Sequence, residues 1–115
     1  MTSYNNSVVR PPINSALFNV REIAKQMLLL EDHLTDTEKY CVDCIRKHFL
    51  MMEALAEEAV AMDSRSKWTE ECLSLAGKIR RWEIMFCDKV HKYTISQEIR
   101  ATRKELVQLI FDPRG

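Results

Sequence analysis

Apolar side chains recur at spacings of three and four residues over most of the chain, which is the pattern of helices that bury one face. A first helix is predicted from about Asn19 to His33, and a second from about Asp36 to Met62. A third is predicted from about Arg65 to Lys92, and a short fourth helix is predicted to open at Ser96. The pattern therefore predicts an all-α protein.

Capping residues set the predicted helix boundaries. Asn19 and Glu22 are spaced as a capping box, and Thr35 is expected to cap the second helix. Either Asp63 or Ser64 can cap the third helix. Because the connections are short, neighbouring helices should run antiparallel. We expect an antiparallel three-helix unit with a short fourth C-terminal helix, as a single domain over residues 15–112 with a C-terminal tail at 113–115.

Residues 1–14 are predicted to form an extended N-terminal arm. This stretch is polar, and Pro11-Pro12 holds the backbone near polyproline geometry. An extended segment can dock in a groove of a neighbouring subunit as a strand or polyproline helix. The arm residues expected to make such contacts are Tyr4, Val8, Val9 and Ile13. On the domain itself, the candidates for contacts between subunits are Phe18, Met51, Met85 and Phe111.

The composition narrows the classes of function. Seventeen basic side chains balance seventeen acidic ones, so no net charge favours nucleic acid. Two glycines leave no glycine-rich phosphate loop. The longest apolar run, Met27 to Leu30, is too short to span a membrane, and no secretory leader opens the chain. We therefore expect an intracellular protein whose cysteines are thiols or metal ligands, with no membrane span.

The stretch KYCVDCIRKHF, residues 39–49, contains Cys41, Cys44 and His48 within three turns of predicted helix. In an antiparallel bundle, Cys87 falls at about the level of Cys41, with His91 one turn beyond. His33, at the end of the first helix, meets the start of the second. Several thiols and imidazoles should therefore gather in one half of the bundle.

This grouping leaves three interpretations of the cysteines open. Zinc is bound tetrahedrally by thiolates and imidazoles, so a site made by Cys41, Cys44, His48 and Cys87 is feasible and would join the second and third helices. Alternatively, the cysteines pack as small apolar residues, as free cysteines usually do. The third interpretation is that Cys41 and Cys44 form a redox pair.

The redox interpretation is supported by a resemblance to a known family of enzymes. The segment YCVDCIRKHF resembles the active site of the Erv-type sulfhydryl oxidases, and RRWEIMFCDKVHKY resembles their flavin-binding segment. The resemblance implies a FAD-dependent oxidase that uses Cys41 and Cys44. The chain lacks the His-Asn-x-Val-Asn pattern with which that family holds flavin. The oxidase is therefore the alternative function.

A second resemblance covers Leu28 to Asp63. The segments LLLEDHL and KYCVDCIRKHFLMMEALAEEAVAMD are similar to those of a small family of uncharacterised helical proteins in large DNA viruses. This resemblance implies a viral origin and a location in the virion. Since no catalytic constellation is evident, we expect a non-enzymatic structural component, such as a minor capsid protein, that binds other capsid subunits and needs no cofactor other than a possible zinc ion.

Overall fold

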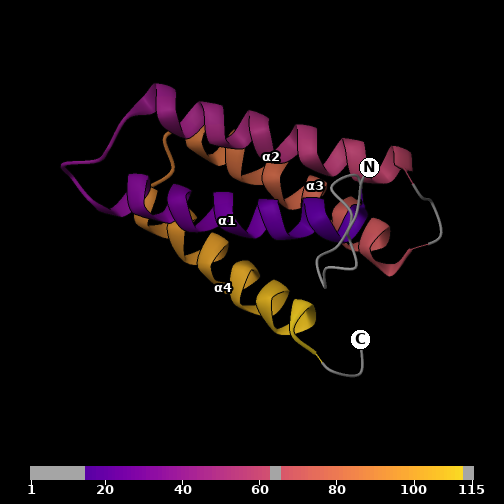
Figure 1. The fold of residues 1–115 in the computed structure, drawn as a ribbon. Coiled ribbons are helices and arrows are strands. Elements are labelled where there is room, and N and C mark those ends of the chain that lie inside the picture. The colour runs from indigo at the N-terminus through magenta and orange to yellow at the C-terminus, as the bar shows by residue number, and fades with distance from the viewer. Residues whose placement is uncertain (1–14, 63–65, 113–115) are drawn as a thin grey trace, which may run out of the picture.

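A computed structural model describes residues 15–62 and 66–112, which form four α-helices (Figure 1). The helices are α1 (Ala16–Thr35), α2 (Val42–Met62), α3 (Lys67–Cys87) and α4 (Lys92–Ile110). The described residues contain no strand, so the predicted all-α class is confirmed. The N-terminal arm, with Tyr4, Val8, Val9 and Ile13, lies outside the described residues.

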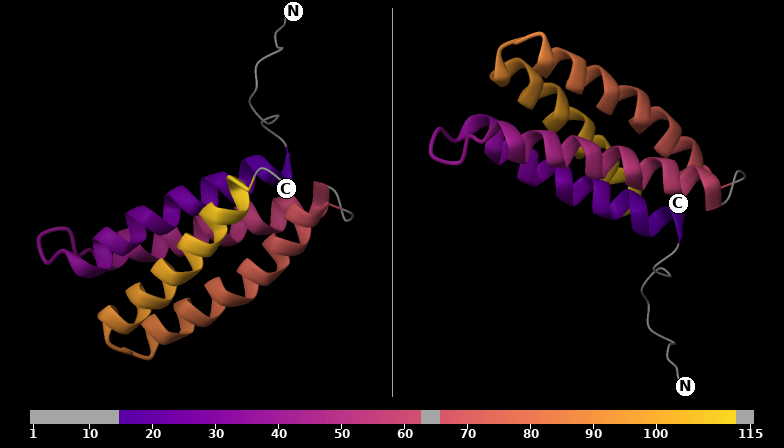
Figure 2. Two further views of the ribbon diagram at one scale, coloured as in Figure 1. Left: turned by 90° about the horizontal axis from the view of Figure 1, so that it is seen from below. Right: turned by 90° about the horizontal axis from the view of Figure 1, so that it is seen from above.

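The four helices do not all pack equally closely against one another. α1 and α2 run antiparallel and pack together along their length, α3 packs on the other side of α2, and α4 packs on α1 (Figure 1). By contrast, α3 and α4 diverge from the turn that joins them (Figure 2). None of the four described helices is both long and apolar enough to cross a bilayer. The bundle is thus closed on its α1–α2 side and open between α3 and α4.

The core follows the predicted apolar stripes. Its largest fully buried side chains are Trp82, Phe49, Ile23, Met27, Leu30, Leu34, Ile45, Met52, Ile79, Ile95, Ile99 and Leu106. All four helices contribute to this set, so a single core holds the domain together. Burial of these side chains is the main source of stability.

The start of α1 differs from the prediction. Ser15 is the N-cap, and its hydroxyl accepts the Phe18 N–H at 3.0 Å. Asn19, predicted as the cap, is instead buried inside α1. Its amide donates to the Leu55 carbonyl at 2.8 Å and to the Glu58 carboxylate at 2.9 Å. The predicted capping box is wrong because this buried amide is needed to bridge α1 and α2.

The boundary between α1 and α2 also differs. The Thr35 hydroxyl donates to the Glu31 carbonyl at 2.8 Å, so Thr35 ends α1 and does not cap α2. The Asp36 carboxylate then accepts the Glu38 N–H at 2.9 Å, which makes a side-chain turn. As a result α2 begins at Val42, six residues later than predicted.

The third and fourth helices have shifted boundaries too. Ser66 caps α3 by accepting the Trp68 N–H at 3.0 Å, while Asp63 and Ser64 lie outside the described residues. α3 ends at Cys87 rather than Lys92, and α4 begins before Ser96. α4 has 19 residues against 21 in α3, so the fourth helix is not short.

A Schellman motif ends α3. The Val90 N–H donates to the Met85 carbonyl at 2.9 Å, and the Lys89 N–H donates to the Phe86 carbonyl at 3.1 Å. Lys89 has a φ of 61°, in the left-handed region where glycine is preferred. The chain therefore reverses direction between α3 and α4 at the cost of strain at one lysine.

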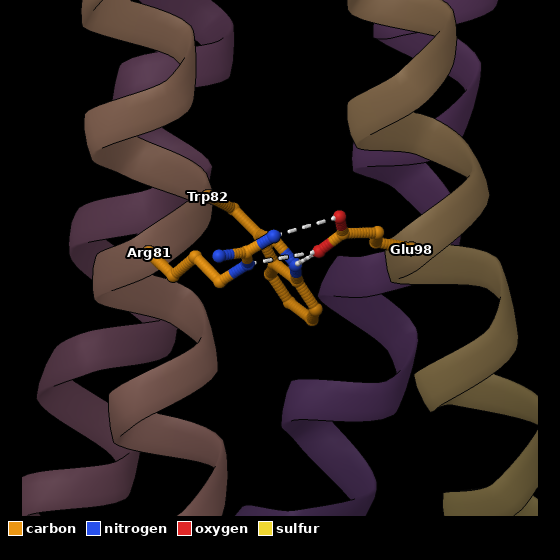
Figure 3. Close-up of polar contacts among 3 residues, drawn as sticks. All are labelled: Arg81, Trp82 and Glu98. Atoms are coloured by element: carbon orange, nitrogen blue, oxygen red, sulfur yellow. Dashed lines mark hydrogen bonds and ion pairs between the residues drawn. The ribbon is translucent and has the colours of Figure 1, made fainter.

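Near that turn one carboxylate joins α3 to α4 (Figure 3). Glu98 accepts the indole N–H of Trp82 at 3.2 Å and two guanidinium N–H groups of Arg81, each at 3.2 Å. Arg81 and Trp82 therefore make a direct polar contact between the two helices. Farther along, α4 is joined to α1 by an ion pair between Arg103 and Glu31.

Candidate functional site

The predicted thiols and imidazoles do gather at one end of the bundle. Cys87 and His91 line a cavity together with Tyr40 and Val42 from the start of α2. Because these residues line one cavity, Cys87 lies at about the level of Cys41, as predicted from the antiparallel order of the helices. We call this region, which comprises the α1–α2 connection and the α3–α4 turn, the thiol end.

The four cysteines are free thiols in different surroundings. Cys72 is fully buried, and burial raises the pKa of its thiol to about 11. It packs as an apolar residue. Cys41 and Cys44 are half-buried, and Cys87 is exposed. The packing interpretation therefore fits Cys72 but does not account for the other three.

Cys41 immediately precedes the first turn of α2. Its sulfur accepts the backbone N–H of Cys44 at 3.3 Å. A hydrogen bond from the Cys44 thiol, together with this backbone N–H, lowers the pKa of Cys41. The same thiol–thiol contact raises the pKa of Cys44. Of the two sulfurs, Cys41 is therefore the one that more readily carries negative charge.

Two histidine rings pair where the end of α1 meets the start of α2. His33 Nδ1 is 2.7 Å from the Lys39 carbonyl oxygen, so the end of α1 meets the start of α2 as predicted. His48 Nδ1 is hydrogen-bonded to the Gln26 side-chain oxygen. The two rings are 5.1 Å apart between centroids and tilted by 36°. Burial, followed by the charge of His33, lowers the pKa of His48.

The predicted zinc ligands are not brought together as one set. Cys87 lies at the end of α3 on the cavity wall, and the His91 ring nitrogen accepts the Tyr93 N–H at 3.1 Å as the cap of α4. Within residues 15–62 and 66–112, no three His, Cys, Asp or Glu side chains are placed to hold a metal ion. The spacing of Cys87 and His91 suggested a shared helical face, but α3 ends before it reaches His91.

The cavity at the thiol end has a volume of about 650 Å³. Its lining residues are Tyr40, Val42, Arg46, Phe86, Cys87, Lys89, Val90, His91 and Lys92. Three of these are permanent cations, and none of the nine has a carboxylate. The Lys92 ammonium lies 4.4 Å from the centre of the Tyr40 ring. The cavity was not predicted, because its lining residues come from two segments that lie about 45 residues apart in the chain.

The predicted subunit-contact residues fall into two groups. Met51 and Phe111 are exposed, at 50% and 73%, and remain available for contacts. Phe18 is half-buried, and Met85 packs against the core. Met85 therefore contributes to packing within the domain, and its part in contacts between subunits stays a prediction.

One carboxylate pair was missed. A hydrogen bond with the Glu83 carboxyl and partial burial raise the pKa of Glu53 to about 7. Glu53 Oε2 is itself buried without a hydrogen-bond partner. The sequence held no indication of this pairing between α2 and α3.

We compared the chain with known proteins by family, by sequence and by structure. No protein-family model, curated protein or solved structure matches it.

Proposed function

We propose that this protein is a non-enzymatic component of a larger protein assembly, and that it binds an acidic segment of a neighbouring subunit in the thiol-end cavity. The observation that carries this proposal is the composition of the cavity wall. Arg46, Lys89 and Lys92 line a concave surface that includes Tyr40 and Phe86 and has no carboxylate.

This wall suits a particular kind of partner. The aromatic and aliphatic side chains offer an apolar floor for one large side chain, and the three cations would pair with acidic groups next to it. A protein of net charge zero has no general attraction for anions. Binding would therefore depend on this local concentration of positive charge.

The conformation of Lys89 supports the same proposal. A helix that ends in a Schellman motif usually has glycine at the left-handed position, whereas here it has lysine. Strained residues of this kind are often retained for function. A lysine at this position adds a cation to the cavity wall that glycine would not provide.

The resemblance of Leu28 to Asp63 to helical proteins of large DNA viruses suggests which assembly this is. We propose a virus particle, in which the chain is a minor capsid component. In that setting, the N-terminal arm and the exposed Met51 and Phe111 would add contacts with other capsid proteins.

A peptide-display selection tests the cavity as a binding site. Random peptides are selected on the full-length protein and the enriched sequences are read. We expect acidic residues flanking an aromatic or large aliphatic residue. The affinity of the best peptide is then measured by fluorescence polarisation on the wild type and on a Lys89→Glu/Lys92→Glu variant, where we expect at least about a tenfold loss.

The control has the same charge change elsewhere. Arg100→Glu/Lys104→Glu reverses two exposed cations on α4 that do not line the cavity, and it should bind like the wild type. Enrichment of basic peptides, or equal losses in both double variants, would contradict the proposal.

The geometry of Cys41 and Cys44 favours a second candidate function, that of a sulfhydryl oxidase. The Cys44 N–H directed at Cys41 Sγ stabilises a thiolate there. In such an enzyme the two thiols would become a disulfide, and two electrons and two protons would pass to a flavin and then to dioxygen, giving hydrogen peroxide. Oxygen uptake with a reduced dithiol, abolished by Cys41→Ser, would establish this activity, and its absence in a flavin-loaded protein would exclude it.

A further inference from the structure

We propose that Cys41 and Cys44 form a reversible disulfide that regulates the thiol-end cavity. The oxidant is a low-molecular-weight disulfide, and the reaction is thiol–disulfide exchange. This regulation rests on the binding function proposed above, since it controls how well the cavity accepts an acidic segment. It requires neither a flavin nor dioxygen, which distinguishes it from the oxidase reaction.

Cys41 is held at the start of α2 by two hydrogen bonds. Its carbonyl accepts the Ile45 N–H at 2.9 Å, and its sulfur accepts the Cys44 N–H at 3.3 Å. These two bonds place Cys41 at the N-cap of α2, where helix N–H groups and the helix dipole stabilise a thiolate. Because the thiolate is the form that attacks a disulfide, Cys41 is the nucleophile of the exchange.

The Cys44 thiol is positioned to complete the reaction. The two cysteine side chains already share a hydrogen bond, so their sulfurs face each other. Residues three apart on a helix have Cα atoms about 5 Å apart, which is within the range that a disulfide joins. Both thiols are free and only half-buried, so a small reagent can reach them.

The exchange takes place in two steps. The Cys41 thiolate attacks one sulfur of the small disulfide, forms a mixed disulfide with it and expels the other half as a thiolate. Cys44 then loses its proton to solvent, and its sulfur attacks Cys41 and expels the remaining half. The protein dithiol is oxidised by two electrons, and the small disulfide is reduced to two thiols.

The residues on both sides of Cys41 connect the disulfide to the cavity. Tyr40 and Val42 line the cavity, and the Lys92 ammonium lies 4.4 Å from the centre of the Tyr40 ring. A disulfide brings its sulfurs to about 2 Å, closer than a hydrogen bond between thiols allows. Cys44 lies within the first turn of α2, whereas Cys41 precedes the helix. We therefore expect oxidation to displace Cys41 with its neighbours and to weaken binding at the cavity.

Equilibration in glutathione buffers tests whether the disulfide forms. The full-length Cys87→Ser variant is used, because Cys87 is an exposed thiol on the cavity wall that would also react. In oxidising buffer we expect the intact protein to lose two hydrogen atoms, and peptide mass spectrometry to find Cys41 linked to Cys44. Adding Cys44→Ser should stop the reaction at one glutathione adduct on Cys41.

Peptide binding tests the regulation. The affinity of the selected acidic peptide is measured by fluorescence polarisation on the reduced and oxidised forms of the same variant. The oxidised form should bind at least about fivefold more weakly, as is typical of coupled sites. By linkage, saturating peptide should shift the glutathione equilibrium toward the dithiol by the same factor. The matched Cys41→Ser/Cys44→Ser/Cys87→Ser variant should bind equally in both buffers.

The results separate this regulation from the binding function on which it rests. Absence of the disulfide in oxidising buffer, or equal peptide affinities of the reduced and oxidised forms, would overturn the regulation and leave the binding function standing. Failure of the reduced protein to bind acidic peptides would contradict the binding function, and the regulation with it.

Discussion

The bundle consists of two antiparallel helix pairs that are held together in different ways. α1 and α2 pack along their whole length through fully buried side chains, including Leu30 and Phe49. α3 and α4 meet only near their turn, where Glu98 joins Arg81 and Trp82 (Figure 3). Beyond that contact the two helices diverge and leave a hollow of about 450 Å³. The second pair is instead held by what each helix packs against, since α3 lies on α2 and α4 lies on α1.

This difference separates two tasks within one small domain. Both pairs contribute fully buried side chains to the one core, so the difference lies in how the two helices of each pair meet. The pair joined by a strained turn presents charged side chains on a cavity wall, where tight packing would remove them from reach of a partner.

Truncation in the core is expected to give the largest contrast between the pairs. Phe49→Ala removes a fully buried ring from α2 and should lower the free energy of unfolding by about 3–5 kcal/mol. Leu109→Ala, on the open side of α4 where the side chain is 37% exposed, should cost less than about 1 kcal/mol. Urea denaturation measures both, and equal costs would contradict the distinction.

Loss of the Glu98 contact should act on the second pair alone. Glu98→Ala removes the acceptor of the Trp82 indole and of the Arg81 guanidinium, and we expect a loss of about 1 kcal/mol because the ion pair is largely exposed. Amide hydrogen exchange should become faster in α4 and stay unchanged in the middle of α1 and α2. Faster exchange throughout the chain would show that the two pairs unfold together.

Relief of the strain at Lys89 gives an effect of opposite sign. Lys89→Gly should raise the free energy of unfolding by about 1 kcal/mol, since glycine adopts a φ of 61° without a clash. The same change should weaken the binding of acidic peptides to the cavity. A more stable variant with unchanged peptide affinity would mean that Lys89 has no part in binding.

The dependence of stability on pH should have opposite signs at two interfaces. Glu53, between α2 and α3, has its pKa raised from 4.5 to about 7, so the folded state holds this proton more tightly than the unfolded state. Its contribution is therefore fully present below pH 4.5 and is lost as the pH rises through about 7.

The contribution of Glu98 to stability depends on pH with the opposite sign. A hydrogen bond from Arg81 lowers its pKa, so its contribution is present above the unfolded pKa and is lost as the pH falls through the folded value. Because Glu53 loses its contribution as the pH rises, the urea midpoint of the wild type, measured from pH 4 to 8, should decline toward pH 7. Glu53→Gln should remove this decline, and a slope that persists in that variant would have another cause.

The sequence predicted what depends on helical periodicity and missed what depends on contacts between distant residues. The stripe that includes Ile45, Phe49 and Met52 was readable because one buried face repeats every three to four residues. The role of Asn19 could not be predicted, since a polar residue near a helix start looks like a cap until its partners on α2 are known. Thr35 was likewise predicted to cap α2 because of its residue type, but its hydroxyl bonds back to Glu31 and Thr35 ends α1 instead.

The features of the candidate site also divide into those that could be predicted from the sequence and those that could not. The gathering of thiols and imidazoles at one end was predictable from the antiparallel order of the helices. The failure of Cys87 and His91 to share a helical face could not be predicted, because it depends on where α3 ends. The cavity was also hidden, since Lys89 contributes to it only through the left-handed turn.

The central proposal is that the thiol-end cavity binds an acidic segment of a partner through Arg46, Lys89 and Lys92. Titration of the selected acidic peptide on the wild type and on the Lys89→Glu/Lys92→Glu variant tests this proposal most directly. We expect the double variant to bind at least about tenfold more weakly, because both substitutions reverse charges on the cavity wall. Equal affinities in the two proteins would contradict it.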